Sequence, residues 1–180
     1  VRSYKKFIDM HCQSQESVNR RMFMPGELGW WALKNREDSQ NEPTHADDIE
    51  YLMGRCLGTD SGFALMGISP ANVDAAPALP RLAEIIKRYE DVRHSGKVSE
   101  AMKARLRVPG DEYALVGDVA SGWHFLPVRY DTRRVAGAEE YHSVWKTDNR
   151  FAPQPLRVRI EALMGAGPYD APGNITLTDF

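Results

Sequence analysis

A carboxylate followed closely by two indoles is the feature of this sequence best suited to chemistry on a sugar. Glu27 comes directly after a Pro-Gly break, and Trp30 and Trp31 stand shortly after it. A carboxyl group can act as acid, base or nucleophile at a glycosidic bond. A flat indole face suits the apolar C–H face of a pyranose. The alternative is a strand end with two core tryptophans, and the sequence leans toward the sugar site.

The roles of these three residues are not independent. Trp30 and Trp31 are adjacent, so in an extended segment they point to opposite faces. One of them can then belong to the core while the other serves as a sugar platform, and core packing of both is the alternative. For Glu27 the alternative to catalysis is a structural role, in which the carboxylate caps or bridges the loop.

Helices and strands alternate around this stretch. Amphipathic spacing predicts helices at residues 3–20, 44–58, 82–93 and 99–106, and apolar runs predict strands at 22–24 and 62–68. The second helix opens with a possible capping box at Thr44 and Asp47, and Gly58 is its predicted end. The second strand suits burial on both faces. This order implies right-handed βα units and a parallel sheet, and the lack of a Gly-rich loop after either strand disfavours a dinucleotide fold.

The pattern changes after Pro109-Gly110. Short β-rich segments separated by turn residues follow at residues 112–116, 123–130, 156–163 and 174–180. In residues 156–163 apolar and charged residues alternate, which predicts one buried face and one face in water. Regularly spaced strands of this kind favour an antiparallel β-sandwich. We therefore expect a domain boundary near residues 107–111, with one domain at 1–108 and an incomplete one at 109–180.

Composition narrows the class of protein. The formal net charge of −2 argues against a nucleic-acid partner. No apolar run approaches the roughly 18 residues that span a bilayer. Cys12 and Cys56 fall on apolar stripes and are expected to be buried thiols, and without a nearby His/Asp cluster they predict no metal site. The chain starts without Met and stops inside a strand pattern, so we expect an internal part of a longer protein.

Four segments carry a family resemblance. They are PGELGWWAL at 25–33, DDIEYLMGRCLGTDSGFAL at 47–65, IIKRYEDVR at 85–93 and NRFAPQPLRVRIEAL at 149–163. Together they resemble the C-terminal part of a (β/α)8-barrel glycoside-hydrolase-like bacterial polysaccharide-processing protein, which runs into a galactose-binding-like β-sandwich. The resemblance implies an α/β fold made of the last βα units of a TIM-type barrel. Residues 22–24 would be its seventh strand and 63–68 its eighth.

The resemblance also implies a site. Active sites of such barrels lie at the carboxyl ends of the strands, so the loops at 25–44 and 69–80 would line it. Glu27 would be the catalytic nucleophile or acid/base, and Trp30, Trp31 and Asp74 would contact substrate. The implied partners are a glycan and the remainder of the same polypeptide. No cofactor or metal is implied, and the expected location is periplasmic or extracellular.

Two other functions remain open from the sequence. The barrel could be a degenerate scaffold that binds glycan without hydrolysing it. The chain could also belong to an unrelated α/β enzyme whose site lies wholly outside these residues. A second catalytic carboxylate, which glycoside hydrolysis usually requires, is expected on an earlier strand outside this chain.

Overall fold

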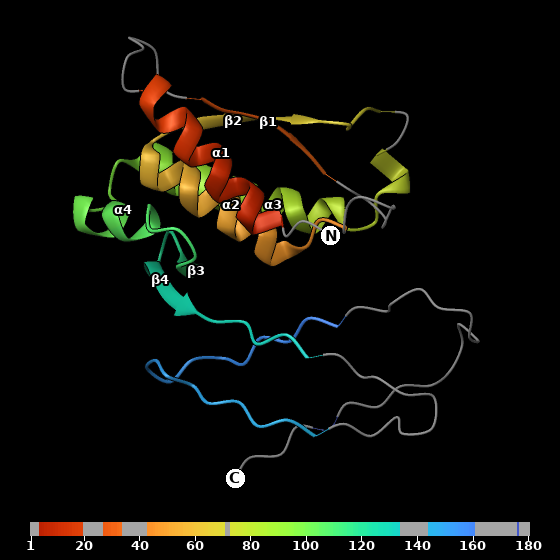
Figure 1. The fold of residues 1–180 in the computed structure, drawn as a ribbon, viewed down its shortest axis with the longest axis vertical. Coiled ribbons are helices and arrows are strands. Elements are labelled where there is room, and N and C mark those ends of the chain that lie inside the picture. The colour runs from red at the N-terminus through yellow and green to blue at the C-terminus, as the bar shows by residue number, and fades with distance from the viewer. Residues whose placement is uncertain are drawn as a thin grey trace.

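The computed structural model describes residues 4–19, 27–33, 43–70, 73–133, 144–160 and 176. Figure 1 shows the chain from its N-terminus to its C-terminus. The elements in order are α1 (Tyr4–Asn19), β1 (Glu27–Ala32), α2 (Ala46–Thr59), β2 (Gly62–Met66), the 3-10 helix η1 (Val73–Ala75), α3 (Leu79–Ser95), α4 (Glu100–Leu106), β3 (Glu112–Asp118) and β4 (Gly122–Val128).

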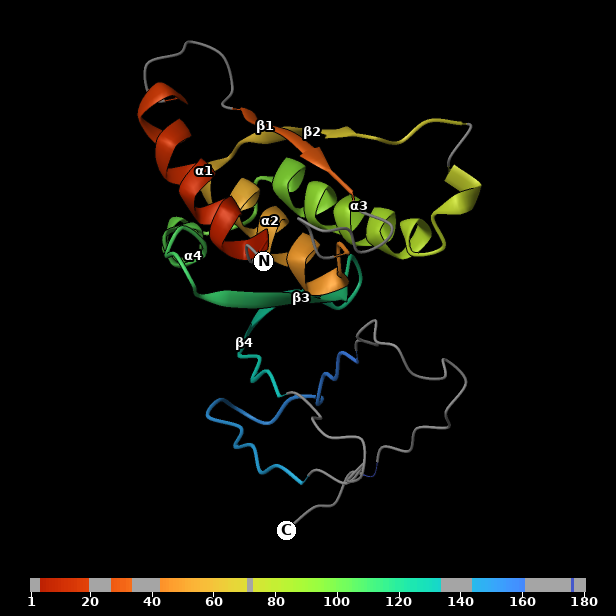
Figure 2. The same cartoon turned by 45° about the vertical axis from the view of Figure 1, so that its right-hand side comes forward.

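The helices lie between two small sheets. Figures 1 and 2 agree that the β1–β2 pair lies on one side of α1, α2 and α3, and the β3–β4 hairpin on the other. The strands β1 and β2 are parallel, with Trp31 opposite Leu65 and Ala32 opposite Met66, as the alternation of elements predicts. Within the described residues they form a two-stranded sheet and no closed barrel, so the (β/α)8 architecture stays a prediction.

The first strand of the described residues is β1. It begins at Glu27 and ends at Ala32, whereas the predicted strand at 22–24 lies outside the described residues. Adjacent aromatic residues suit a half-buried pleated surface, and in β1 the two tryptophans lie inside the strand. Gly29 has a φ of +87°, and a Cβ there would lie 3.0 Å from His11 Nε2. The positive φ, more than the contact with the end of the His11 side chain, favours a glycine at this position of β1.

Helix α2 begins one residue later and ends later than its sequence signals indicate. The Asp48 carboxylate accepts a hydrogen bond of 2.9 Å from the His45 N–H, so the capping box uses Asp48 and not Asp47. Gly58, the predicted end, lies inside the helix. The helix ends instead where Asp60 adopts a left-handed conformation with φ of 55°. The shift leaves the Asp47 carboxylate free of capping and available for other partners.

Two glycines of α2 face α4 and differ in the space around them. A Cβ on Gly58 would lie 3.1 Å from Lys103 O and 3.2 Å from Arg107 N, both backbone atoms, whereas a Cβ on Gly54 would meet only Leu106 Cδ2 at 3.5 Å. Alanine gains about 1 kcal/mol of helix propensity over glycine at either position, but overpacking at Gly58 costs about 1–3 kcal/mol.

We therefore expect Gly54→Ala to raise the free energy of unfolding above that of the wild type. The free energy of unfolding of Gly58→Ala should be about 1–3 kcal/mol lower than that of Gly54→Ala. Urea denaturation of the two variants and the wild type measures both effects. Equal stability of the two alanine variants would show that α4 moves away at no cost.

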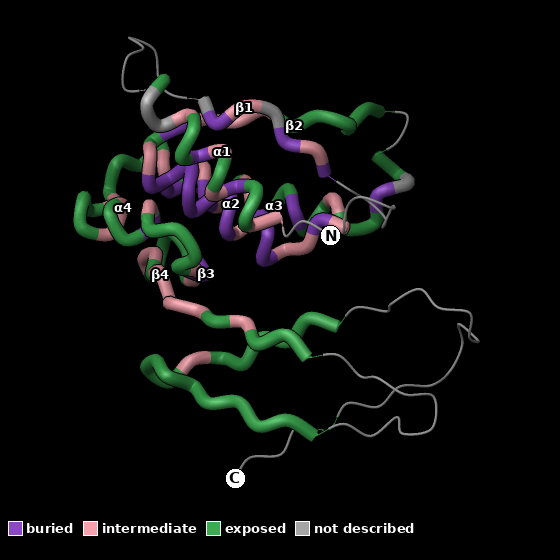
Figure 3. The backbone as a smooth tube through the Cα atoms, viewed as in Figure 1, coloured by how far each residue is buried: buried purple, intermediate pink, exposed green. Residues whose placement is uncertain are grey.

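The second strand is more exposed than predicted. Leu65 and Met66 are 39% and 46% exposed, and Figure 3 marks the carboxyl half of β2 as exposed. The prediction of burial on both faces is wrong for these residues, because the described helices cover only one face of the pair. An apolar run bounded by glycines does not distinguish a strand covered on both faces from one covered on a single face.

The main core runs through the helices into the hairpin. Ile49 of α2, Leu82 and Tyr89 of α3, and Tyr113 and Leu115 of β3 belong to one cluster of buried side chains. The Tyr89 hydroxyl also donates to the Tyr113 carbonyl at 3.2 Å. The core therefore continues across residues 107–111, where the sequence predicts a domain boundary.

The C-terminal half contains one described strand pair. β3 and β4 are antiparallel and match the predictions for residues 112–116 and 123–130. Residues 144–160 contain no strand, and residues 161–163 and most of 174–180 lie outside the described residues. The expected burial of Leu156, Val158 and Ile160 is wrong, since these side chains are 62%, 55% and 69% exposed. The intervening arginines instead face α2, where carboxylates pair with them.

Candidate functional site

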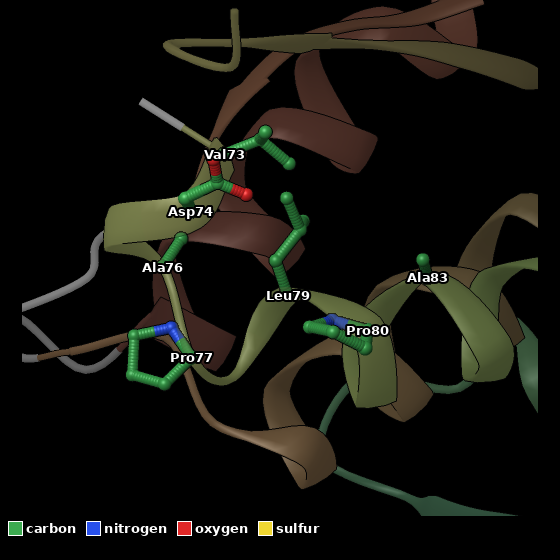
Figure 4. A pocket seen from close by; sticks show the side chains of 7 residues that line it. All are labelled: Val73, Asp74, Ala76, Pro77, Leu79, Pro80 and Ala83. Carbon is green, nitrogen blue, oxygen red and sulfur yellow. The ribbon is translucent and has the colours of Figure 1, made fainter. Parts of the chain in front are cut away.

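The carboxyl end of the parallel pair leads into an open hollow. The chain leaves β2, forms η1 and enters α3, and these segments surround a space of about 460 Å³. Figure 4 shows the side chains that line it. They are Val73, Asp74, Ala76, Pro77, Leu79, Pro80 and Ala83. The position agrees with the expected site of a βα fold, in the loop after a strand.

Among the described residues that line this hollow, Asp74 is the one with a charged side chain. It is exposed, and in Figure 4 its carboxylate lies on the η1 side of the space, across from Leu79. The six other lining residues are apolar. Such a wall can cover the C–H face of a sugar while the carboxylate accepts hydrogen bonds from hydroxyl groups. Asp74 is thus the predicted site residue that the structure brings to the expected end of the sheet.

Glu27 lies at the other end of the strand pair. It is the first residue of β1 and pairs with Gly62, the first residue of β2. With a rise of about 3.3 Å per residue, Glu27 is roughly 16 Å along the strand from Ala32. The expectation that Glu27 follows the carboxyl end of its strand therefore does not hold, because the strand starts with it. Its side chain lies outside the described part of the structure.

Trp31 is a core residue. Its side chain is 2% exposed, and its indole Nε1 donates to the Leu28 carbonyl at 3.1 Å. The rings of Tyr4, Phe7 and His11 from α1 surround it in edge-on contacts, with centroids 6.0, 5.6 and 5.2 Å away. A role as sugar platform is therefore excluded for Trp31, since neither indole face is free. The Trp30 side chain lies outside the described residues, and its role stays a prediction.

A partly buried charge network at the first turn of α2 is the feature that sequence reasoning missed. Lys5 Nζ lies 2.7 Å from Asp47 Oδ2 and 2.6 Å from Glu112 Oε2. Arg159 Nη1 lies 2.8 Å from Asp47 Oδ1. The network joins α1, α2, β3 and the segment at 144–160. The sequence indicates Asp47 only as a partner of the helix dipole, because its other partners come from distant parts of the chain.

The two carboxylates that Lys5 contacts have pKa values shifted in opposite directions. Burial alone would raise the pKa of Asp47, but hydrogen bonds and charges from Lys5 and Arg159 together hold that pKa below its ordinary value. At Glu112 burial outweighs the hydrogen bond from Lys5, and the pKa is raised. Asp47 is therefore the well-compensated anion of the network. Since its described partners satisfy it, the network holds elements together and offers no open ligand position.

The thiols and other titratable groups form no further site in the described structure. Cys12 and Cys56 are 4% and 0% exposed, and burial is the main cause that raises the pKa of both thiols. Among the described residues, no three His, Cys, Asp or Glu side chains gather in a way that could hold a metal ion.

None of the helices in the described part is long and apolar enough to cross a membrane. Comparison of the chain with protein-family models, with curated proteins and with solved structures finds no match to any of them.

Proposed function

We propose that this chain is part of a carbohydrate-active enzyme that hydrolyses glycosidic bonds, and that it contributes one wall of the glycan site. The observation that carries the proposal is the hollow at the carboxyl end of the β1–β2 pair, with Asp74 among apolar side chains. Binding sites of parallel βα units occur at this end. The proposal of a glycan as substrate rests on the resemblance of residues 25–33 and 47–65 to glycoside-hydrolase-like proteins.

In this proposal Asp74 is the carboxylate at the reacting end. It accepts hydrogen bonds from sugar hydroxyls or exchanges a proton with the glycosidic oxygen. Hydrolysis needs a second carboxyl group, at about 5–5.5 Å for retention or roughly 6.5–9.5 Å for inversion. Glu27 begins β1 at the opposite end of the pair, so the second group is assigned to another strand of the sheet.

A non-catalytic glycan-binding scaffold is the second candidate function. Two observations favour it over hydrolysis by the predicted residues. Trp31 is enclosed in the core, and Glu27 starts its strand. The two features with the strongest chemical signal in the sequence thus give no direct support for hydrolysis, whereas the hollow at Asp74 suits binding as well as catalysis.

The experiment compares Asp74→Asn with wild type in the natural protein that contains this chain, assayed on plant and host glycans. We expect kcat/KM to fall at least about tenfold, because a hydrogen bond to a charged group contributes about 1.5–3 kcal/mol. Asp111→Asn is the matched control, since Asp111 is exposed and does not line the hollow.

The remaining outcomes separate the candidates. Unchanged hydrolysis by Asp74→Asn would remove the hollow from the reaction. Absence of hydrolysis in the wild type, together with glycan binding that Asp74→Asn weakens, would favour the scaffold. A large loss in Glu27→Gln with none in Asp74→Asn would return the catalytic role to Glu27.

A further inference from the structure

A second hollow lies beside the end of β4. One wall consists of residues 128–130, which leave β4, and the other of residues 147–151 and 154–157, and the space measures about 150 Å³. In Figure 2 the two walls belong to the chain just after β4 and to the blue segment near it. We call this space the arginine hollow, because Arg129, Arg150 and Arg157 line it. It is separate from the hollow at Asp74, which no residue of this set lines.

Hydrogen bonds fix the walls of the arginine hollow. Gln154 Nε2 donates to the Pro127 carbonyl at 2.9 Å and so ties the second wall to β4. Asn149 accepts from the Phe151 N–H at 3.0 Å and donates to the Ala152 carbonyl at 3.1 Å, which closes a tight turn. These amide side chains are occupied by the backbone. They shape the hollow and leave other groups to meet a ligand.

The three arginines are not equivalent. Arg157 Nη1 lies 2.7 Å from Glu50 Oε2, and Arg129 Nε lies 3.5 Å from Asp131 Oδ1. No carboxylate of the described residues lies within ion-pair distance of Arg150, although Asp148 lines the same hollow. Among the three arginines of the hollow, Arg150 is thus the one without a described carboxylate at ion-pair distance, while the Asp148 carboxylate lowers the net positive charge of the space.

Aromatic surface accompanies this charge. Tyr130 and Phe151 both line the hollow, and the Phe151 side chain is 37% exposed. The Tyr130 ring is held by Lys5, whose Nζ lies 4.8 Å from the ring centroid. Aromatic faces suit the C–H face of a pyranose, and a guanidinium matches a carboxylate or a sulfate with two parallel hydrogen bonds.

We propose that the arginine hollow binds one saccharide unit that carries a negative charge, with Arg150 on the anionic group and Phe151 against the ring. The choice of a saccharide rests on the proposed function, while the charge and the size come from the hollow itself. Its volume of about 150 Å³ is below the roughly 300–1,000 Å³ of sites for drug-sized ligands, which favours a single sugar unit.

The test measures binding of four small probes to the full chain by calorimetry and ligand-observed NMR at low ionic strength. The probes are D-galacturonate, D-galactose 6-sulfate, neutral D-galactose and inorganic sulfate. We expect one or both acidic sugars to bind at least about tenfold more tightly than galactose and than inorganic sulfate. Arg150→Gln should weaken that binding at least about tenfold, the effect of losing one charge-assisted pair. The two acidic sugars distinguish a carboxylate from a sulfate ester.

Arg133→Gln is the matched control, because it removes the same charge from an exposed residue that does not line the hollow. Equal binding of galactose and the acidic sugars, or an Arg150→Gln variant that binds like wild type, overturns the proposal. Sulfate binding as tight as that of the sugars also overturns it, in favour of a simple anion site. Asp74→Asn tests the proposed function separately. If acidic sugars bind to the arginine hollow but the protein hydrolyses no glycan, the proposed hydrolysis fails while the inference about the arginine hollow holds.

Discussion

Trp31→Ala is expected to lower the free energy of unfolding by about 3–5 kcal/mol, the usual cost of removing a buried large aromatic side chain. The indole is 2% exposed and lies between β1 and the aromatic side chains of α1. Its removal leaves a cavity against Tyr4, Phe7 and His11, and it also leaves the Leu28 carbonyl without its hydrogen bond of 3.1 Å. Urea denaturation followed by circular dichroism measures the loss.

Trp145→Ala provides the comparison, since Trp145 is 47% exposed and surface substitutions usually change stability by less than about 0.5 kcal/mol. Trp31→Phe should recover part of the stability by refilling the space. If Trp31→Ala matched Trp145→Ala in stability and instead abolished glycan binding, Trp31 would be a platform after all.

Asp47→Asn is expected to lower the free energy of unfolding by about 3 kcal/mol, because it leaves Lys5 in a partly buried position with one fewer counter-charge. The side chains of Lys5 and Asp47 are 18% and 11% exposed. For a chain of this length the loss corresponds to a decrease in Tm of about 6–12 °C. Differential scanning calorimetry at pH 7 measures it.

Glu112→Gln is the matched control, since it removes the other carboxylate that Lys5 contacts. The pKa of Glu112 is raised, mainly by burial, so its stabilising contribution is present at low pH and is lost as the pH rises through the folded-state pKa. At pH 7 the charged form of Glu112 opposes folding, and its neutral replacement should cost much less than Asp47→Asn. Equal losses for the two variants would contradict this difference.

The pH dependence has the opposite sign at Asp47. Its folded-state pKa lies below the ordinary value of 3.8, because Lys5 and Arg159 outweigh burial. The stability that it contributes is present above 3.8 and is lost as the pH falls through the lowered pKa. The stability difference between wild type and Asp47→Asn should therefore shrink below pH 4, in unfolding curves recorded from pH 7 downward.

The helices could be predicted from the sequence because their signals are local. The apolar spacing of residues 82–93 falls within α3, and Ser99 caps α4 by accepting a hydrogen bond from the Met102 N–H at 3.2 Å. A capping side chain and its helix lie within one turn of each other, so the sequence contains the whole interaction. The same holds for the turn between β3 and β4.

The candidate site could be predicted only in part, because its residues depend on distant partners. The family resemblance implies Asp74 as a site residue, and the order of the elements predicts the end of the sheet that its loop follows. The choice between Trp30 and Trp31 depends on α1, which covers one face of β1, and no local pattern indicates this. The partners of Asp47 come from Lys5, 42 residues earlier, and Arg159, 112 residues later. Neither separation leaves a periodic signal in the sequence.

The continuity of the core across residues 107–111 bears on how the molecule loses its structure. Leu115 and Tyr113 pack in the same cluster as Ile49 and Leu82, so the hairpin cannot separate from the helices without exposing apolar surface on both. Segments that share buried contacts open together as one cooperative unit. Although the composition changes at Pro109, we therefore expect the helices and the β3–β4 hairpin to unfold and refold together as one cooperative unit.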